Sequence, residues 1–131
     1  MSQHFSTHDG SAIVADLVSV IVANREYLSE VDGAIGDGDH GINMAKGFAH
    51  CGRTIEGRQL TLAEALDELT LSLMEGIGGS MGPLYGSLFI GMADEVRGRE
   101  DIDAATFAHL LRGGLTSLQD ITEAGVGDKC L

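Results

Sequence analysis

Apolar residues recur along most of the chain at steps of three and four residues, and the alternation typical of strands is scarce. Such spacing lines apolar side chains along one face of an α-helix. We therefore expect five helices joined by glycine-rich loops, over residues of about 9–31, 41–56, 61–76, 83–98 and 103–121. The first helix can be capped by Asp9 or Ser11. Five consecutive helices predict an all-α bundle.

Local signals mark several helix starts. Thr61 followed three residues later by Glu64 matches a capping box. Pro83 suits the first position of a helix, where its missing N–H costs nothing, and Asp103 can cap the last helix. The apolar residues expected to face the core include Leu17, Val20, Ile42, Phe48, Leu66, Leu69, Leu73, Met74, Phe107, Leu110, Leu111, Leu115 and Ile121.

Composition and charge narrow the class of protein. The 131 residues, 44% of them hydrophobic, suffice for one domain with a single core. A net charge of −12 disfavours nucleic acid and anionic membranes as partners. Two cysteines, Cys51 and Cys130, form neither a disulfide framework nor a zinc pattern, and the apolar run from Ala12 to Ala23 is too short to span a bilayer. These features predict a cytoplasmic protein without a secretion signal or membrane span.

The segment DGAIGDGDHG, from Asp32 to Gly41, holds three carboxylates, four glycines and one histidine. A simple turn needs one or two such residues, whereas Asp32, Asp37 and Asp39 would repel one another unless a cation neutralised them. An EF-hand is excluded because Phe48 stands where its bidentate glutamate would be required. Carboxylates suit Mg²⁺, and glycines let backbone N–H groups approach a phosphate.

The histidine of this segment has several possible roles. His40 could be a metal ligand, a general base or a hydrogen-bonding residue at a helix start. Mg²⁺ prefers oxygen ligands, which favours a contact with a nucleotide or phosphate instead. Asn43 lies one helical turn further on the same side and would be available to the same ligand.

A second segment, GIGGSMGPLYGS from Gly76 to Ser87, joins a glycine-rich loop to a helix start. The N-terminus of a helix offers unpaired N–H donors to an anion. The segment lacks the GxxxxGK[ST] pattern of a P-loop, and taken alone it is better explained as a tight turn between helices. Tyr85 and Phe89 suit the core better than stacking on a base.

Together these segments carry a family resemblance. DGAIGDGDHGINMAKGF, then GGSMGPLYGSLF, then GDK at 127–129, resemble the nucleotide-binding DhaL-type subunit of dihydroxyacetone kinase. The resemblance covers essentially the whole chain. It implies an antiparallel barrel of eight amphipathic helices, with the nucleotide and two Mg²⁺ ions held at one end by the loops. About five of those helices fit in this sequence, so residues 1–131 are expected to form a single DhaL-like domain that lacks the C-terminal third.

The resemblance also assigns the site residues. It makes Asp32, Asp37 and Asp39 the ligands of two Mg²⁺ ions that bridge the phosphates of ADP or ATP. It implies nucleotide contacts from His40, Gly41, Ile42, Asn43, Gly79, Ser80, Met81, Thr122 and Leu131. Three of these depart from the family pattern, because Met81 replaces a usual serine, Thr122 a usual glycine and Leu131 a usual methionine. Phosphoryl transfer between bound groups needs no covalent nucleophile, so no catalytic side chain is expected.

The implied partners follow from the same family. A separate subunit would carry dihydroxyacetone, and either a phosphotransferase-system protein or exchanged ATP would supply the phosphoryl group. The missing helices would leave apolar faces exposed, which predicts a homo-oligomer or weak stability. The alternatives are a non-catalytic nucleotide-binding or scaffold subunit, a kinase for a related ketose such as erythrulose, and a helical interaction domain with an incidental acidic turn.

Overall fold

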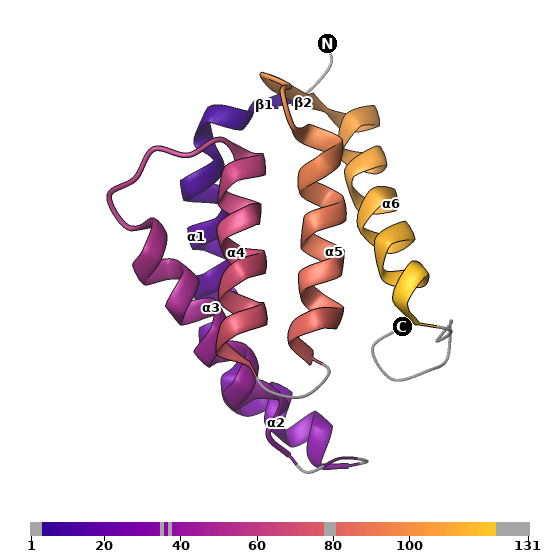
Figure 1. Cartoon of the computed structure of the whole chain (residues 1–131). Coiled ribbons are helices and arrows are strands. Elements are labelled where there is room, and N and C mark those ends of the chain that lie inside the picture. The colour runs from indigo at the N-terminus through magenta and orange to yellow at the C-terminus, as the bar shows by residue number, and fades with distance from the viewer. Residues whose placement is uncertain (1–3, 35, 37, 78–80, 123–131) are drawn as a thin grey trace.

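Helices dominate the computed structural model, which describes residues 4–34, 36, 38–77 and 81–122 (Figure 1). The all-α prediction is confirmed. Six α-helices and two short strands lie within the described residues, in the order β1 His4–Ser6, a 3₁₀ turn Thr7–Asp9, α1 Gly10–Ala23, α2 Arg25–Gly33, α3 His40–Ile55, α4 Leu62–Gly76, α5 Met81–Val96, β2 Asp101–Asp103 and α6 Ala104–Ile121.

The helices form a bundle in which neighbours along the chain are mostly neighbours in space. α4 packs against α3 and α5, α5 against α6, and α1 against α3 and α4. α6 lies at one edge beside α5, and α2 lies at the lower end of the bundle under α3 (Figure 1). One end of the bundle therefore holds the starts of α3 and α5 and the end of α6.

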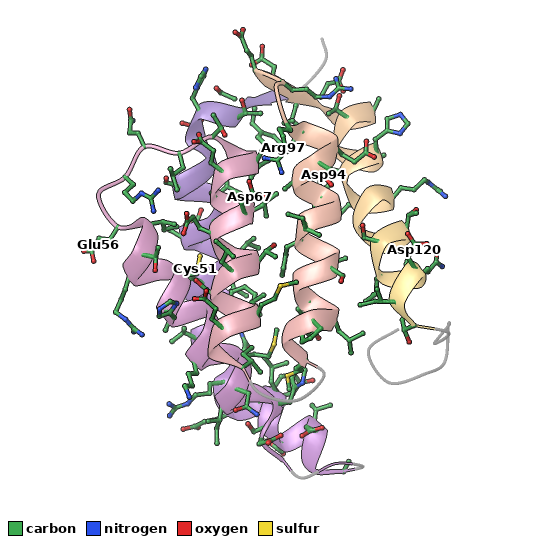
Figure 2. All side chains as sticks on the ribbon, in the orientation of Figure 1. Cys51, Glu56, Asp67, Asp94, Arg97 and Asp120 are labelled. Carbon is green, nitrogen blue, oxygen red and sulfur yellow. The ribbon has the colours of Figure 1, made fainter. Side chains whose placement is uncertain are left out.

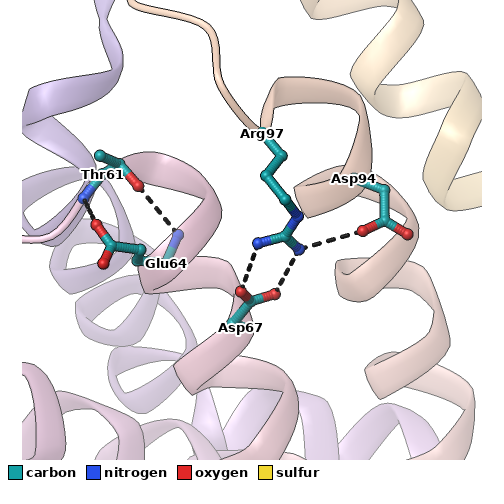
Figure 3. A network of polar contacts seen from close by, with 5 residues as sticks. All are labelled: Thr61, Glu64, Asp67, Asp94 and Arg97. Atoms are coloured by element: carbon teal, nitrogen blue, oxygen red, sulfur yellow. Dashed lines mark hydrogen bonds and ion pairs between the residues drawn. The ribbon is translucent and has the colours of Figure 1, made fainter.

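Two of the predicted helix starts are confirmed by their hydrogen bonds. Thr61 Oγ1 accepts the Glu64 N–H at 3.3 Å, and Glu64 Oε1 accepts the Thr61 N–H at 3.0 Å (Figure 3). Asp103 accepts the Thr106 N–H at 2.8 Å. Backbone hydrogen bonds to the two carboxylates lower the pKa of Glu64 and of Asp103. Local sequence chemistry thus sets the starts of α4 and α6.

The start of α1 is arranged differently from the prediction. Asp9 occupies the N-cap position but makes no capping hydrogen bond with its side chain. Ser11 Oγ instead donates to the Arg58 carbonyl at 2.7 Å and accepts the Leu60 N–H at 3.1 Å. Ser11 therefore ties α1 to the loop before α4 and does not cap its own helix.

The predicted first helix is wrong in its length, because the structure divides it at Asn24 into α1 and α2. The Asn24 backbone leaves helical geometry at φ −103° and ψ 14°. Its side-chain Nδ2 donates to the Val20 carbonyl at 2.8 Å and satisfies an acceptor at the end of α1. The apolar periodicity continues across this break, so the sequence pattern gave no sign of it. As a consequence Asp32 lies in the last turn of α2 and not in a loop.

Two further boundaries differ from the sequence prediction. α5 includes Met81, so Pro83 lies in the first turn rather than at the first position. The strands β1 and β2 were not predicted, and they pair antiparallel with His4 opposite Asp103 and Ser6 opposite Asp101. Each strand has three residues, which is too short for a periodic signal.

The core lies between α3, α4 and α5 and is lined by α1, β2 and α6. Buried apolar side chains include Val14, Phe48, Cys51, Leu66, Leu69, Leu73, Val96, Ile102 and Leu110. The Phe48 and Phe89 rings meet edge to face, with centroids 6.0 Å apart, so Phe89 packs with the core as expected. Cys51 lies on α3 in the part of the bundle next to α4, and burial raises the pKa of its thiol to about 11 (Figure 2).

Several predicted core positions are wrong. Leu17, Val20, Ile42, Met74, Phe107, Leu111, Leu115 and Ile121 are exposed. Six of them lie on α1 and α6. Among the described helices α6 packs mainly against α5, on one side, so only part of its apolar stripe is covered. None of the described helices is long and apolar enough to cross a membrane.

Small residues set the distance between α5 and α6. A methyl group at Gly113 would lie 2.9 Å from the Gly91 carbonyl oxygen, and one at Gly114 would lie 2.8 Å from the Leu88 carbonyl oxygen. At the end away from α2, Arg97 joins α5 to α4 through two hydrogen bonds to Asp67, of 2.8 and 3.0 Å (Figure 3). Backbone packing and a two-pronged ion pair thus hold these helices together.

Candidate functional site

The candidate site lies at the end of the bundle formed by α2, the start of α3 and the start of α5 (Figure 1). The acidic segment and the glycine-rich segment are far apart in sequence, yet both reach this end. The His40 ring, at the start of α3, lies 6.1 Å from the Tyr85 ring of α5, with a tilt of 58°. The structure therefore brings the two predicted segments together, as their resemblance to a nucleotide site implied.

Asp32 is the first residue of the acidic segment and bonds to the backbone near the other end of that segment. Its side chain is buried, with 7% of the residue exposed, in the last turn of α2. Its Oδ2 atom accepts the N–H of Gly38 at 3.1 Å and the N–H of His40 at 3.3 Å. Gly38 has φ +77°, a conformation that glycine adopts without strain. A buried carboxylate thus sits against the backbone amides of the loop, at the entrance to α3.

The first turn of α3 is capped by side chains from α2. Asp39 occupies the N-cap position, but its side chain makes no capping hydrogen bond. Instead, Asp32 accepts the His40 N–H, and Ser29 Oγ accepts the Ile42 N–H at 3.2 Å. Sequence reasoning missed Ser29. Its position three residues before Asp32, on the same face of α2, is the signal that could have found it.

Gly41 allows α2 and α3 to cross in backbone contact. It is buried, and a methyl group there would overlap the Arg25 carbonyl and lie 2.7 Å from Ser29 Oγ. The resemblance assigned Gly41 to the nucleotide. The structure gives it a packing role in addition, because only a residue without a side chain fits at this crossing.

The other predicted contacts that the structure describes lie in the first turn of α3, at the start of α5 and directly after α6. His40 and Asn43 are half-buried in the first turn of α3, and Ile42, expected in the core, is 56% exposed. Met81 is half-buried at the start of α5 and packs against the core, and Thr122 directly follows α6. Of the remaining predicted site residues, Asp37, Gly79, Ser80 and Leu131 lie outside the described residues.

The donor set suits a hard cation but is incomplete in what the structure describes. Asp32 and Asp39 supply carboxylate oxygens at adjacent positions of the fold, and oxygen is the ligand type that Mg²⁺ prefers. Within the described residues, which omit Asp37, no three His, Cys, Asp or Glu side chains gather closely enough to hold a metal ion. A Mg²⁺ ion bound here would take further oxygen ligands from Asp37, phosphate or water.

A groove of about 690 Å³ runs beside the site, between the α1–α2 junction and α3. Two exposed cations, Arg25 and Lys46, line it in a chain of net charge −12. Ile42 is the one predicted site residue in its lining. The groove is thus a neighbour of the carboxylate end and does not contain it.

Comparison with known proteins places these features in a family. The DAK2 domain matches residues 34–131, which is about three quarters of the chain. The chain is 38% identical over 112 residues to the ADP-binding subunit DhaL of a PTS-dependent dihydroxyacetone kinase from Lactococcus lactis, covering 85% of this chain and 56% of that protein. It is 34% identical over 109 residues to the ADP-binding subunit DhaL of PEP-dependent dihydroxyacetone kinase 1 from Listeria innocua, covering 82% and 54%.

A eukaryotic relative is longer still. Mouse triokinase/FMN cyclase is 32% identical over 123 residues, which are 92% of this chain and 21% of that protein. The chain spans about half the length of the bacterial relatives it matches. The matched domain covers α3 to α6 and includes the starts of α3 and α5, where the acidic and glycine-rich segments meet. The chain therefore belongs to the DAK2 domain family.

Proposed function

We propose that this chain binds ADP or ATP with Mg²⁺ at the α2–α3–α5 end and acts as the nucleotide-binding part of a dihydroxyacetone kinase. The phosphoryl group would pass to a hydroxyl of a small keto-sugar held by a separate subunit. The bacterial relatives support this proposal because they are named as ADP-binding subunits of such kinases. The observation that carries it is the meeting of the acidic and glycine-rich segments at one end of the bundle, where His40 contacts Tyr85.

The residues of the site have distinct proposed roles. Asp32, Asp37 and Asp39 would hold Mg²⁺, which neutralises charge on the nucleotide phosphates when bound. His40 and Asn43 lie on one side of the first turn of α3, within reach of the same end. Phosphoryl transfer depends mainly on positioning and electrostatics, so the chain needs no nucleophile of its own.

Further nucleotide contacts are proposed from the glycine-rich segment and the end of the chain. Gly79, Ser80 and Met81 would approach the phosphates beside the start of α5, with Met81 contributing its backbone. Thr122 follows α6 at the same end of the bundle, and Leu131 would contact the adenine. Backbone N–H groups near a helix start suit a phosphate, which supports this part of the proposal.

The relatives' names favour one phosphoryl source. The bacterial kinases are called PTS-dependent and PEP-dependent. We infer that ADP stays bound here and is rephosphorylated by a phosphotransferase-system donor protein. A chain of this kind would retain nucleotide through many turnovers, whereas an ATP-exchanging kinase would release ADP each time. Nucleotide retained after gel filtration distinguishes the two.

A second candidate, nucleotide binding without transfer, is favoured by the length of the relatives. The chain spans about half of each bacterial relative, so groups needed for transfer can lie in the part without a counterpart here. Adding the chain to a substrate-binding subunit loaded with dihydroxyacetone, with Mg²⁺–ATP or a phosphorylated phosphotransferase-system protein as phosphoryl donor, separates the candidates. Formation of the phosphate ester supports the kinase, and tight Mg²⁺-dependent ADP binding without the ester supports the second candidate. Repeating the assay with erythrulose tests the choice of ketose.

Calorimetry with Mg²⁺ and ADP tests the shared basis of both candidates. Removing one of three clustered carboxylates should weaken binding strongly, so we expect Asp37→Ala to lower ADP affinity at least about tenfold. Asp16→Ala is the matched control, because Asp16 is exposed on α1 and its loss changes net charge equally. Chelation of Mg²⁺ should abolish binding to the unmodified chain. Equal affinities of the Asp37 variant and the unmodified chain would refute the assignment of the site.

A further inference from the structure

The contact between α2 and α3 rests on two kinds of hydrogen bond. Asp32 supplies two bonds through one carboxylate oxygen, to Gly38 and His40. Ser29 supplies one through its hydroxyl, to the Ile42 N–H at 3.2 Å. Both residues project from α2, and both hold backbone amides at or next to the start of α3.

A bound cation would involve the Asp32 hydrogen bonds and the Ser29 hydrogen bond to different extents. In the proposed function the Asp32 carboxylate serves both the cation and the backbone amides, so metal binding and these hydrogen bonds involve the same group. The hydroxyl of Ser29 is neutral and belongs to none of the predicted ligands. Its bond to Ile42 is therefore the tie between α2 and α3 that does not compete with the metal.

The packing around Ser29 makes this tie specific. Gly41 lets the two backbones meet, and Ser29 Oγ lies 2.7 Å from the place that a methyl group on Gly41 would take. Ser29 is half-buried, and its bond to the Ile42 N–H lies near the surface, beside the exposed Ile42 side chain. The hydroxyl thus fills the crossing and bonds across it.

We propose that Ser29 is a positioning residue of the nucleotide site, whose hydroxyl fixes the first turn of α3 against α2 and so holds Asp32 at a set distance from Asp39 and His40. This inference rests on the proposed function. Ser29 acts through the residues it places and touches neither nucleotide nor metal in the proposal. Its effect should therefore appear in ligand affinity and depend on the hydroxyl group.

Substitutions at Ser29 test the hydroxyl directly. One net hydrogen bond is worth a few-fold in an equilibrium, so Ser29→Ala should weaken Mg²⁺–ADP binding about three- to tenfold in calorimetry. Ser29→Thr keeps the hydroxyl and should bind within about twofold of the unmodified chain. Ser29→Val, which matches threonine in shape but lacks the hydroxyl, should bind as weakly as Ser29→Ala. Ser11→Ala is the matched control. Ser11 also bonds backbone groups, those of Arg58 and Leu60, but it lies at the start of α1 and not in the candidate site. The Ser11 variant should lose stability without losing affinity.

The outcomes separate this inference from the function on which it rests. Equal affinity of Ser29→Ala and the unmodified chain overturns the role of Ser29 alone, as does a Thr variant as weak as the Val variant. No Mg²⁺-dependent ADP binding by the unmodified chain overturns the proposed function and the role of Ser29 with it. Amide exchange gives a measure that needs no variant. The Ile42 amide should stay protected when Mg²⁺ and ADP are added, and rapid exchange of this amide would contradict the proposal.

Discussion

The crossing of α2 and α3 makes a quantitative prediction for Gly41→Ala. The added methyl group would overlap the Arg25 carbonyl and lie 2.7 Å from Ser29 Oγ. Overpacking of this kind costs about 1–3 kcal/mol, and the upper part of that range applies because a backbone group must move. Replacing glycine by alanine within a helix raises the free energy of unfolding by about 1 kcal/mol, which offsets part of this cost. We expect a net loss of about 1–2 kcal/mol in the free energy of unfolding.

Gly52→Ala provides the matched control in the same helix. A methyl group there would meet Val18 Cγ1 at 3.2 Å, the end of a side chain that can shift. This variant should be unchanged or more stable by up to about 1 kcal/mol, because the gain in helix propensity faces little opposition. The two variants should therefore differ by about 1–3 kcal/mol, or roughly 4–12 °C in melting temperature for a chain of this size.

Urea denaturation and differential scanning calorimetry measure this difference, and ADP titration shows its effect on the site. Gly41→Ala should bind Mg²⁺–ADP more weakly than Gly52→Ala, since separating α2 from α3 moves Asp32 away from the start of α3. A Gly41 variant as stable as the Gly52 variant would refute the backbone contact. A destabilised Gly41 variant with full ADP affinity would refute the link between the crossing and the site.

Other predictions test the core, the buried thiol and the exposed faces. Leu69→Ala removes a fully buried side chain of α4 and should lower the free energy of unfolding by about 2–5 kcal/mol, whereas Leu71→Ala, at a half-exposed position, should cost less than about 1 kcal/mol in the same urea titration. Burial raises the pKa of Cys51 from 9.0 to about 11, so this thiol stabilises the fold below pH 9 and that contribution is lost as pH rises toward 11. Denaturation curves at pH 8 and 10.5 should show the loss, and Cys51→Ala should reduce it. The exposed apolar residues Phe107, Leu111 and Leu115 on α6 should drive association, which sedimentation would detect. A stable monomer at high concentration would contradict that expectation.

The parts of the fold that could be predicted are those controlled by residues close in sequence. Thr61 and Glu64 start α4 through bonds between themselves, and Asp103 starts α6 by bonding an amide three residues on. The break at Asn24 could not be predicted, because the apolar spacing is the same on both sides of it. A helix boundary that leaves the apolar spacing unchanged can be recognised only from the three-dimensional arrangement of the helices.

The candidate site divides in the same way. Its carboxylates stand in one short segment, and their density alone predicted a cation site, which stays a prediction. Ser29 was not found, because its role exists only where α2 meets α3. The exposed faces of α1 and α6 were expected in the core because periodicity gives the apolar side of a helix but does not say how much of that side is covered.

The order of assembly follows from the bonds around Asp32. Its partners and that of Ser29 are 6, 8 and 13 residues away along the chain. Short loops close quickly and at low entropic cost, so the hairpin of α2 and α3 can form before the contacts between residues far apart in sequence. Tyr85 joins His40 only after α4 and α5 have docked. We therefore expect the α2–α3 half of the candidate site to form early, and nucleotide binding that requires α5 would report that the later helices have docked.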